Sequence, residues 1–270
     1  MVELEKKYQI GVRRFGYINW VGAFSLYKKE VLRFLIVSGQ TLAGPILTSI
    51  LFLIVISLAI GEERKDVLGV PYIEFLANGL IMMQVIQQSF SHSSSSLMMG
   101  KMMGTVIDII NSPLSAAEVT ISIVLASITR GFCIAIISTF IFVMYLELTI
   151  QNYFLWFLYI FLAGLFLGSA GFIAGLYADK FDQMATLTNF IIVPLSFLSG
   201  TFYSIERLPD FLKTISFYNP FFHIIDGFRY SFIGKLDGSL EFGIIFLLII
   251  SIFTWYLSYF LFKKGYKIKS

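Results

Sequence analysis

The chain has 270 residues, of which 57% are hydrophobic and 14% charged, and its formal net charge is +3. Its mean hydropathy of +0.81 excludes an ordinary soluble domain and indicates an integral membrane protein. A single cysteine, Cys133, excludes a disulfide framework or a thiolate metal site within one chain. The basic residues lie near the ends of apolar runs rather than in a patch suited to nucleic acid.

Six stretches are long and apolar enough to cross a bilayer as helices, for which about 20 residues are needed. Continuous apolar runs favour helices, because each helix satisfies its own backbone hydrogen bonds in lipid. The predicted fold is therefore an all-α integral membrane protein with six transmembrane helices. The predicted spans are residues 34–60, 73–98, 119–146, 153–177, 184–204 and 241–262.

The distribution of Lys and Arg predicts the orientation, since positive loops are retained in the cytoplasm. Basic residues of the N-terminal stretch and the C-terminal tail, together with Lys101 and Lys180, fit one side if both termini are cytoplasmic. The charged stretch before Phe34 argues against a cleaved signal peptide. We expect three parts: a cytoplasmic N-terminal segment 1–18, a transmembrane domain 19–265 and a cytoplasmic tail 266–270. The loops predicted outside are 61–72, 147–152 and 205–240, and those predicted inside are 99–118 and 178–183.

The segment before the first span has an apolar side and a basic side. Its apolar residues recur at helical spacing: Trp20, Phe24, Tyr27, Val31 and Phe34. Its basic residues lie opposite: Lys28, Lys29 and Arg33. The pattern predicts an amphipathic interface helix on the cytoplasmic membrane face. The alternative is a cytoplasmic extension of the first membrane helix.

Polar residues gather in the second and third predicted spans. The stretch "QQSFSHSSSSLMM" brings Ser91, His92 and Ser93 into an apolar run, and Arg130 lies in the middle third of the third span. These four residues are the main candidates to line a conduit or contact a substrate headgroup, and the same stretch adds further polar residues: Gln87, Gln88, Ser89 and Ser94 to Ser96. The alternatives are serine hydroxyls bonded to their own helix and an arginine that reaches toward the headgroups. The only other histidine, His223, is predicted on the opposite side, so no metal site is expected.

The inner loop 99–118 contains a short helical pattern that Pro113 ends. Its apolar period runs from Met102 and Met103 through the residues of a possible partner contact: Val106, Ile107, Asp108, Ile110 and Asn111. A short helix with one apolar face suggests a partner's groove. Packing on its own bundle or on lipid headgroups is an equal alternative.

Four glycines form one stripe on the fourth span: Gly164, Gly168, Gly171 and Gly175. Small residues at this spacing let another helix approach closely. The stripe predicts helix packing, within this chain or with another.

The loop before the last span predicts two short helices joined at "YNP". Pro209 suits the first turn of the first helix, while Asn219 and Pro220 suit the N-cap and first position of the second. Each helix is too short to span, so we expect a re-entrant hairpin in the outer leaflet. Its charged residues include Glu206, Arg207, Asp226 and Arg229.

This region resembles the end region of bacterial ABC type-2 permeases, the membrane subunits of exporters. The resemblance is carried by "PLSFLSGTFYSIERLP" and "NPFFHIIDGFR", and the similar layout covers roughly residues 20–265. It is most specific at Pro194, Ser199, Gly200, Pro209, Asn219, Pro220, Asp226 and Arg229. The inner-loop "IDIINSPLSAAEV" also resembles the segment through which such permeases contact their ATPase.

The resemblance implies two permease chains, most simply a homodimer, with a dimer of ATPase subunits that bind ATP and Mg²⁺. The complex would move a lipid-linked, glycan or amphipathic substrate outward across the bacterial inner membrane. The chain itself has no phosphate-binding G-x-x-x-x-G-K-[ST] loop, so we expect neither enzymatic activity nor a cofactor in it. Drug efflux within the family, a secondary transporter or channel without an ATPase, and a membrane-embedded enzyme are the alternatives.

Overall fold

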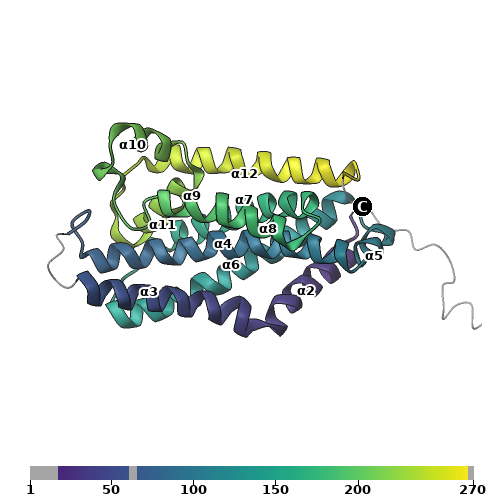
Figure 1. The fold of residues 1–270 in the computed structure, drawn as a ribbon, viewed down its shortest axis with the longest axis horizontal. Helices are drawn as coiled ribbons and strands as arrows, with labels where there is room; N and C mark the ends of the chain where they lie inside the picture. Colours follow the sequence, from purple (N-terminus) through teal and green to yellow (C-terminus); the bar gives the residue numbers. More distant parts are fainter. Residues whose placement is uncertain (1–17, 61–65, 267–270) are drawn as a thin grey trace, which may run out of the picture.

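The structure is a computed structural model that describes residues 18–60 and 66–266. The regular elements of these residues are all helices, which form an elongated bundle (Figure 1). The predicted N-terminal segment 1–18 and tail 266–270 lie almost wholly outside the described residues, and so does part of the first outer loop. The all-α fold class is therefore confirmed for the described part of the chain.

Five long helices run along the bundle (Figure 1). They are α3 (Gly44–Ile60), α4 (Tyr72–Met102), α6 (Ala116–Leu146), α7 (Tyr153–Tyr177) and α12 (Leu240–Lys263). The other α-helices are α2 (Trp20–Ile36), α5 (Val106–Asn111), α8 (Phe181–Leu187), α9 (Val193–Leu198), α10 (Asp210–Phe217) and α11 (Pro220–Ile233). Two π-helical segments, η1 (Gly39–Ala43) and η3 (Thr188–Ile192), join α2 to α3 and α8 to α9, and the 3₁₀ turn η4 (Ile205–Arg207) precedes α10.

Five helical segments in the described residues are long and apolar enough to cross a membrane. They are Gly39–Ala59, Ala116–Leu146, Tyr153–Tyr177, Phe181–Leu198 and Leu240–Lys263. The predicted span 73–98 corresponds to α4, which has 31 residues and is long enough to cross, but is not one of the five. Its amides and serines lower its hydropathy, and contacts with α3, α6, α7 and α11 bury most of its surface.

Two predicted spans differ from the structure by five residues or more at one boundary. The first was expected to begin at Phe34, but that residue belongs to α2, and the membrane-length segment begins at Gly39. Figure 1 shows α2 inclined to α3, so it is not a straight extension of α3. The fifth ends at Leu198, six residues before its predicted end at 204, because Gly200 adopts a left-handed conformation with φ +73° and the chain turns.

Close packing of α7 against α4 and α6 holds the centre of the bundle together. The four glycines of the predicted stripe all face these two helices. A Cβ atom built on Gly164 would lie 3.0 Å from the Cα of Ile128, and one on Gly175 would lie 2.7 Å from the Ser94 carbonyl oxygen. At Gly168 it would overlap the Ser127 hydroxyl, and at Gly171 the Phe90 carbonyl oxygen. The stripe therefore packs within this chain.

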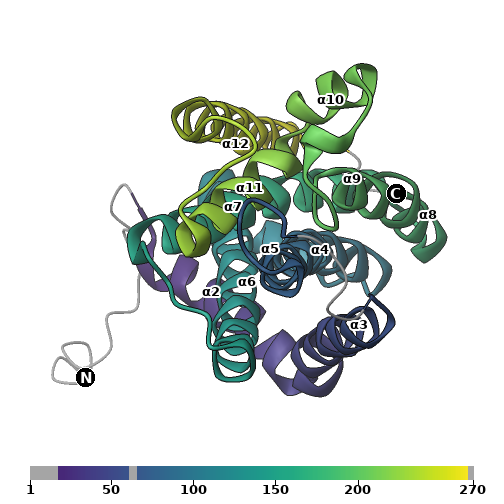
Figure 2. The same ribbon diagram turned by 90° about the vertical axis from the view of Figure 1, so that its left-hand side faces the viewer.

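The two ends of the bundle carry different elements (Figures 1 and 2). The start of α2, α5 and the end of α12 share one end, called here the α5 end. The opposite end holds α10 and the loops beside α9 and α11, and is called here the α10 end. Figure 2 shows α4 near the centre of the bundle, between α3 and α9. The described residues nearest to both termini thus lie at the α5 end, as the predicted layout requires.

We predict that Gly171→Ala destabilises the fold, because the added methyl group would overlap the Phe90 carbonyl oxygen of α4. Overpacking of this kind costs about 2 kcal/mol. Thermal unfolding of the detergent-solubilised chain should show a midpoint several degrees lower. The matched control is Gly39→Ala, because a Cβ there has nothing within 4 Å. Equal midpoints for the two variants would contradict the close α4–α7 contact.

Candidate functional site

The short helix α5 projects one apolar side from the bundle. Val106 is buried, whereas Ile107 is 60% and Ile110 45% exposed, and Asp108 and Asn111 are exposed as well. Pro113 follows the end of the helix, as predicted. Met102 and Met103 do not belong to this helix, contrary to the predicted period, because they end α4 and Gly104 then turns with φ +72°.

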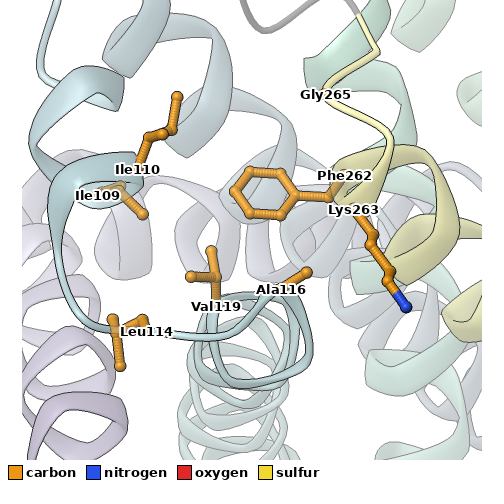
Figure 3. Close-up of a pocket in the computed structure, with 8 residues that line it drawn as sticks. All are labelled: Ile109, Ile110, Leu114, Ala116, Val119, Phe262, Lys263 and Gly265. Atoms are coloured by element: carbon orange, nitrogen blue, oxygen red, sulfur yellow. The ribbon is translucent and has the colours of Figure 1, made fainter.

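Hollows flank α5 on two sides. One has a volume of about 450 Å³ and lies between α5, the start of α6 and the end of α12 (Figure 3). Its lining comprises Ile109, Ile110, Leu114, Ala116, Val119, Phe262, Lys263 and Gly265. The other, of about 440 Å³, lies between α5 and α2, and Asp108 and Lys29 are among its lining residues. The helix α5 is therefore a ridge between two depressions.

Hydrogen bonds fix the segment after α5 to the neighbouring helices. The Asn19 side chain donates to the Pro113 carbonyl oxygen at 3.0 Å, and the Asn19 backbone N–H donates to the Glu118 carboxylate. Glu118 also accepts from the Ser115 N–H and completes a capping box at the start of α6. The segment after α5 is therefore bonded to the starts of both α2 and α6.

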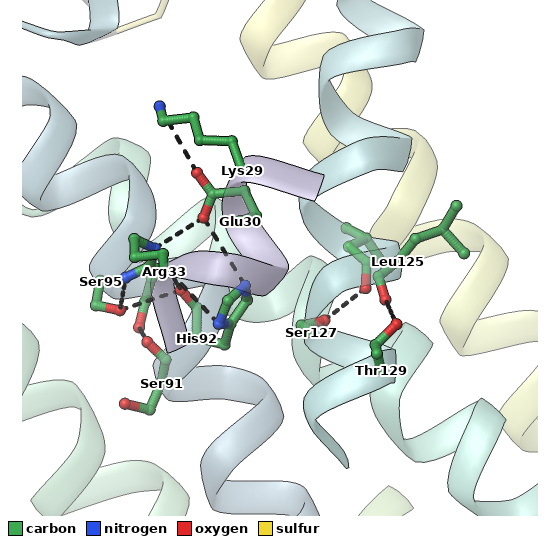
Figure 4. Close-up of polar contacts among 11 residues, drawn as sticks. Lys29, Glu30, Arg33, Ser91, His92, Ser95, Leu125, Ser127 and Thr129 are labelled. Atoms are coloured by element: carbon green, nitrogen blue, oxygen red, sulfur yellow. Dashed lines mark hydrogen bonds and ion pairs between the residues drawn. The ribbon is translucent and has the colours of Figure 1, made fainter. Parts of the chain in front are cut away.

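The side of α2 that faces the bundle carries charges (Figure 4). Glu30 is 2% exposed and accepts a hydrogen bond from Arg33 Nε at 2.9 Å. Arg33 also donates to the His92 carbonyl oxygen at 2.9 Å and to the Ser95 hydroxyl at 3.3 Å. This corrects the prediction for Arg33, which was placed on the basic side of the helix with Lys28 and Lys29, because its charge is stabilised by partners within the bundle.

The polar part of α4 has one half-buried side and one fully buried side. The half-buried residues, called here the α4 stripe, are Gln87, Gln88, Ser91, Ser95 and Ser96. All five belong to the polar stretch of the predicted span, but of the four main candidates for a conduit lining only Ser91 is among them. His92 and Ser93 are completely buried, and Arg130 is 6% exposed behind Gln88. His92 and Ser93 face neighbouring helices and cannot line a conduit. The residues of the α4 stripe are therefore the candidates for such a lining.

The predicted exit hairpin forms α10 and α11 at the α10 end. Asn219 caps α11 by accepting from the Phe221 N–H, and Pro220 is its first residue. Pro209 lies one position before α10 rather than in its first turn, and Glu206 and Arg207 are exposed.

The second helix of this hairpin, α11, is buried on nearly all sides instead of amphipathic. Asp226 accepts from the N–H groups of Asp237 and Gly238, at 3.1 and 2.9 Å. Arg229 is fully buried, donates to the Gly200 carbonyl oxygen at 2.8 Å and lies 3.6 Å from the Phe75 ring centroid. The polar side chains of α11 can be buried because other segments of the chain provide hydrogen-bond partners. Hydrophobic periodicity alone treats polar residues as exposed, so it did not indicate that α11 is buried.

Sequence reasoning did not assign Glu30, Arg33 or Asp237 to a site, and it did not pair Gln88 with Arg130. The paired glutamines at 87 and 88 were a usable signal, because amides inside an otherwise apolar helix need partners. The contact of Arg33 with α4 joins residues far apart in the chain and left no local pattern.

Most of the bundle matches one known protein family. Residues 22–233 match the family described as ABC-2 type transporter. The inner membrane transport permease YadH of Escherichia coli K12 is 30% identical over 239 residues, which cover 88% of this chain and 93% of that protein. Nodulation protein J of Neorhizobium galegae is 24% identical over 248 residues, covering 87% of this chain and 90% of that protein.

We predict that Glu30→Ala destabilises the chain by about 3 kcal/mol, because it leaves the Arg33 guanidinium at the α2–α4 contact without its carboxylate. Thermal unfolding in detergent measures the loss. Lys29→Ala is the control: Lys29 is 56% exposed and 3.9 Å from the same carboxylate, so its removal should change little. If both variants unfold at the wild-type temperature, Glu30 does not hold α2 on the bundle.

Proposed function

Because the chain belongs to the ABC-2 type transporter family, we propose that it is the membrane permease subunit of an ATP-driven exporter. Its relative YadH is named an inner membrane transport permease. The five apolar helices of membrane length support the same multi-pass location in a bacterial inner membrane. The substrate that we propose is a lipid-linked, glycan or otherwise amphipathic molecule, which moves outward.

We propose that α4 is the sixth transmembrane helix. Its 31 residues would rise about 46 Å, more than the hydrocarbon thickness of about 30 Å. The flanking loops then lie on opposite sides, with the α5 end and both termini in the cytoplasm. In this orientation α10 and α11 form a re-entrant hairpin at the outer boundary, with Glu206 and Arg207 toward water.

We propose that α5 is the surface that the ATPase subunit binds, and the exposed apolar side of α5 carries this proposal. Ile107 and Ile110 are solvent-exposed at the α5 end, beside Asp108 and between two hollows. Large apolar side chains in such a position are typical of an interface. ATP and Mg²⁺ would bind in the ATPase subunits, and two permease chains, most simply identical, would complete the transporter.

Coupling would then pass from α5 through hydrogen-bonded helices. The ATPase would move α5, and the bonds of Asn19 to Pro113 and Glu118 would carry the movement into α2 and α6. The bundle would transmit it to the hairpin, where Asp226 and Arg229 join α11 to its surroundings. Transmission of this kind requires elements with two arrangements, which the ATPase cycle would bias.

The double variant Ile107→Ser, Ile110→Ser should keep its fold, because both residues are exposed, and should lose the ATPase. We expect at least a tenfold drop in ATPase activity that co-purifies with the tagged chain from its native membrane, because apolar contacts at the centre of an interface dominate binding.

The matched control for this loss is Phe211→Ser, which removes a side chain that is 74% exposed at the α10 end and should leave the captured activity unchanged. Wild-type chain that brings down no ATP-hydrolysing protein carrying a phosphate-binding loop would contradict the proposed function. Full capture by the double variant would remove α5 from the interface.

A further inference from the structure

Around His92 of α4, the described residues of the contact between α2, α4 and α6 carry more positive than negative charge. Arg33 and Arg130 bring two guanidinium groups there, and Glu30 brings one carboxylate, which is bound to Arg33 at 2.9 Å. The other buried carboxylate of this contact, Glu118, lies at the start of α6, where the N–H groups of Asn19 and Ser115 bind it. Among the residues that the structure describes, no carboxylate lies within ion-pair distance of Arg130.

Arg130 lies almost midway along α6, which is one of the helices long and apolar enough to cross the membrane. Its guanidinium donates to the Gln88 side-chain oxygen and to the Thr41 carbonyl oxygen, the latter at 3.2 Å. Its Nε has no hydrogen-bond partner although it is buried. A cation inside a membrane bundle is costly unless an anion or water compensates it, so a neutral amide and a carbonyl are an incomplete set of partners.

Several residues around Arg130 are half-buried or exposed rather than enclosed. Gln88, which covers the guanidinium, belongs to the half-buried α4 stripe. Arg33 reaches α4 at His92, one helical turn from Gln88, and its side chain is 30% exposed. Beside Thr41, the π-helical segment η1 leaves Gly39 in open space. Two guanidinium groups therefore flank a row of amides and hydroxyls that is open on one side.

We propose that Arg130 and Arg33, with the amides and hydroxyls of the α4 stripe, bind the anionic group of the transported amphiphile, a phosphate or a carboxylate. This inference rests on the proposed function and specifies its substrate class. Guanidinium groups form paired hydrogen bonds with both anions. The apolar part of the ligand would remain in the lipid beside the stripe. The anion would replace the Gln88 oxygen and supply the missing counter-charge.

Arg130 differs from the fully buried Arg229, which lies against the Phe75 ring, because the side chain that covers Arg130 is the half-buried Gln88. This difference suggests the test variant Gln88→Glu, which places a carboxylate where Arg130 already donates a hydrogen bond. The variant should fold at least as stably as the wild type, because a charge-assisted pair replaces a neutral one. It should also exclude an incoming anion. Arg130→Gln removes the cation itself and serves as the second variant.

The experiment measures binding of phosphatidic acid with a fluorescent acyl chain to the full-length chain in detergent, by anisotropy. Phosphatidylcholine with the same acyl chains is the zwitterionic comparison. We expect the wild type to bind phosphatidic acid at least tenfold more tightly, because hydrogen bonds between charged groups are stronger than those between neutral groups. Gln88→Glu and Arg130→Gln should reduce this preference to about twofold or less. Arg207→Gln, at an exposed arginine of the α10 end, should keep it.

Competition by inorganic phosphate distinguishes a free anion from a lipid headgroup as the ligand. If phosphate displaces the probe from the wild-type chain but not from Gln88→Glu, the site also recognises a free anion. If phosphate does not displace the probe from the wild type, the acyl chains are required for binding. Equal binding of the two lipids by the wild type, or an unchanged preference in both variants, would overturn the proposal. Loss of lipid preference with the ATPase still captured would leave the permease assignment intact, whereas failure to capture an ATPase would contradict that assignment alone.

Discussion

The arrangement depends on the enclosure of α4, a helix that is too polar to face lipid. Its serines, amides and histidine can lie at membrane depth only where protein or water meets them. The glycine stripe of α7 makes this possible, because backbone atoms at Phe90 and Ser94 approach α7 more closely than any larger side chain would allow. The apolar helices around α4 then present their hydrophobic surface to lipid, and one side of α4 stays half open.

The same helix connects the parts that a transporter must couple. At the α5 end, α4 leads directly into α5, and Arg33 joins it to α2. Toward the α10 end, Gly79 lies close to the Thr201 backbone, and Phe75 lies against the guanidinium of Arg229 from α11. A shift of α4 would therefore displace its contact residues at both ends of the bundle, and it would also move the α4 stripe relative to Arg130. In our proposal, ATP hydrolysis and anion binding act on this one element.

Local signals predicted the apolar helices well, and long-range contacts decided the rest. The boundaries of α7 were predicted from its apolar run, which the Asn152 cap begins, and Pro113 correctly marked the end of α5. Hydrophobic periodicity could not indicate that Arg33 turns into the bundle, since its partners on α4, His92 and Ser95, lie 59 and 62 residues away in the chain. It also could not indicate that α11 is buried on nearly all sides, because its polar residues bond to segments elsewhere in the chain.

The most direct test of this account is the side of the membrane on which the two ends of α4 lie. Single cysteines can be introduced in a Cys133→Ser background by Asp66→Cys before α4, Ile110→Cys on α5 and Phe211→Cys on α10, all at exposed positions. Labelling by a membrane-impermeant maleimide should reach positions 66 and 211 from outside in spheroplasts and position 110 only in inverted vesicles. Labelling of 66 and 110 from the same side would show that α4 does not cross the membrane, and would contradict the account.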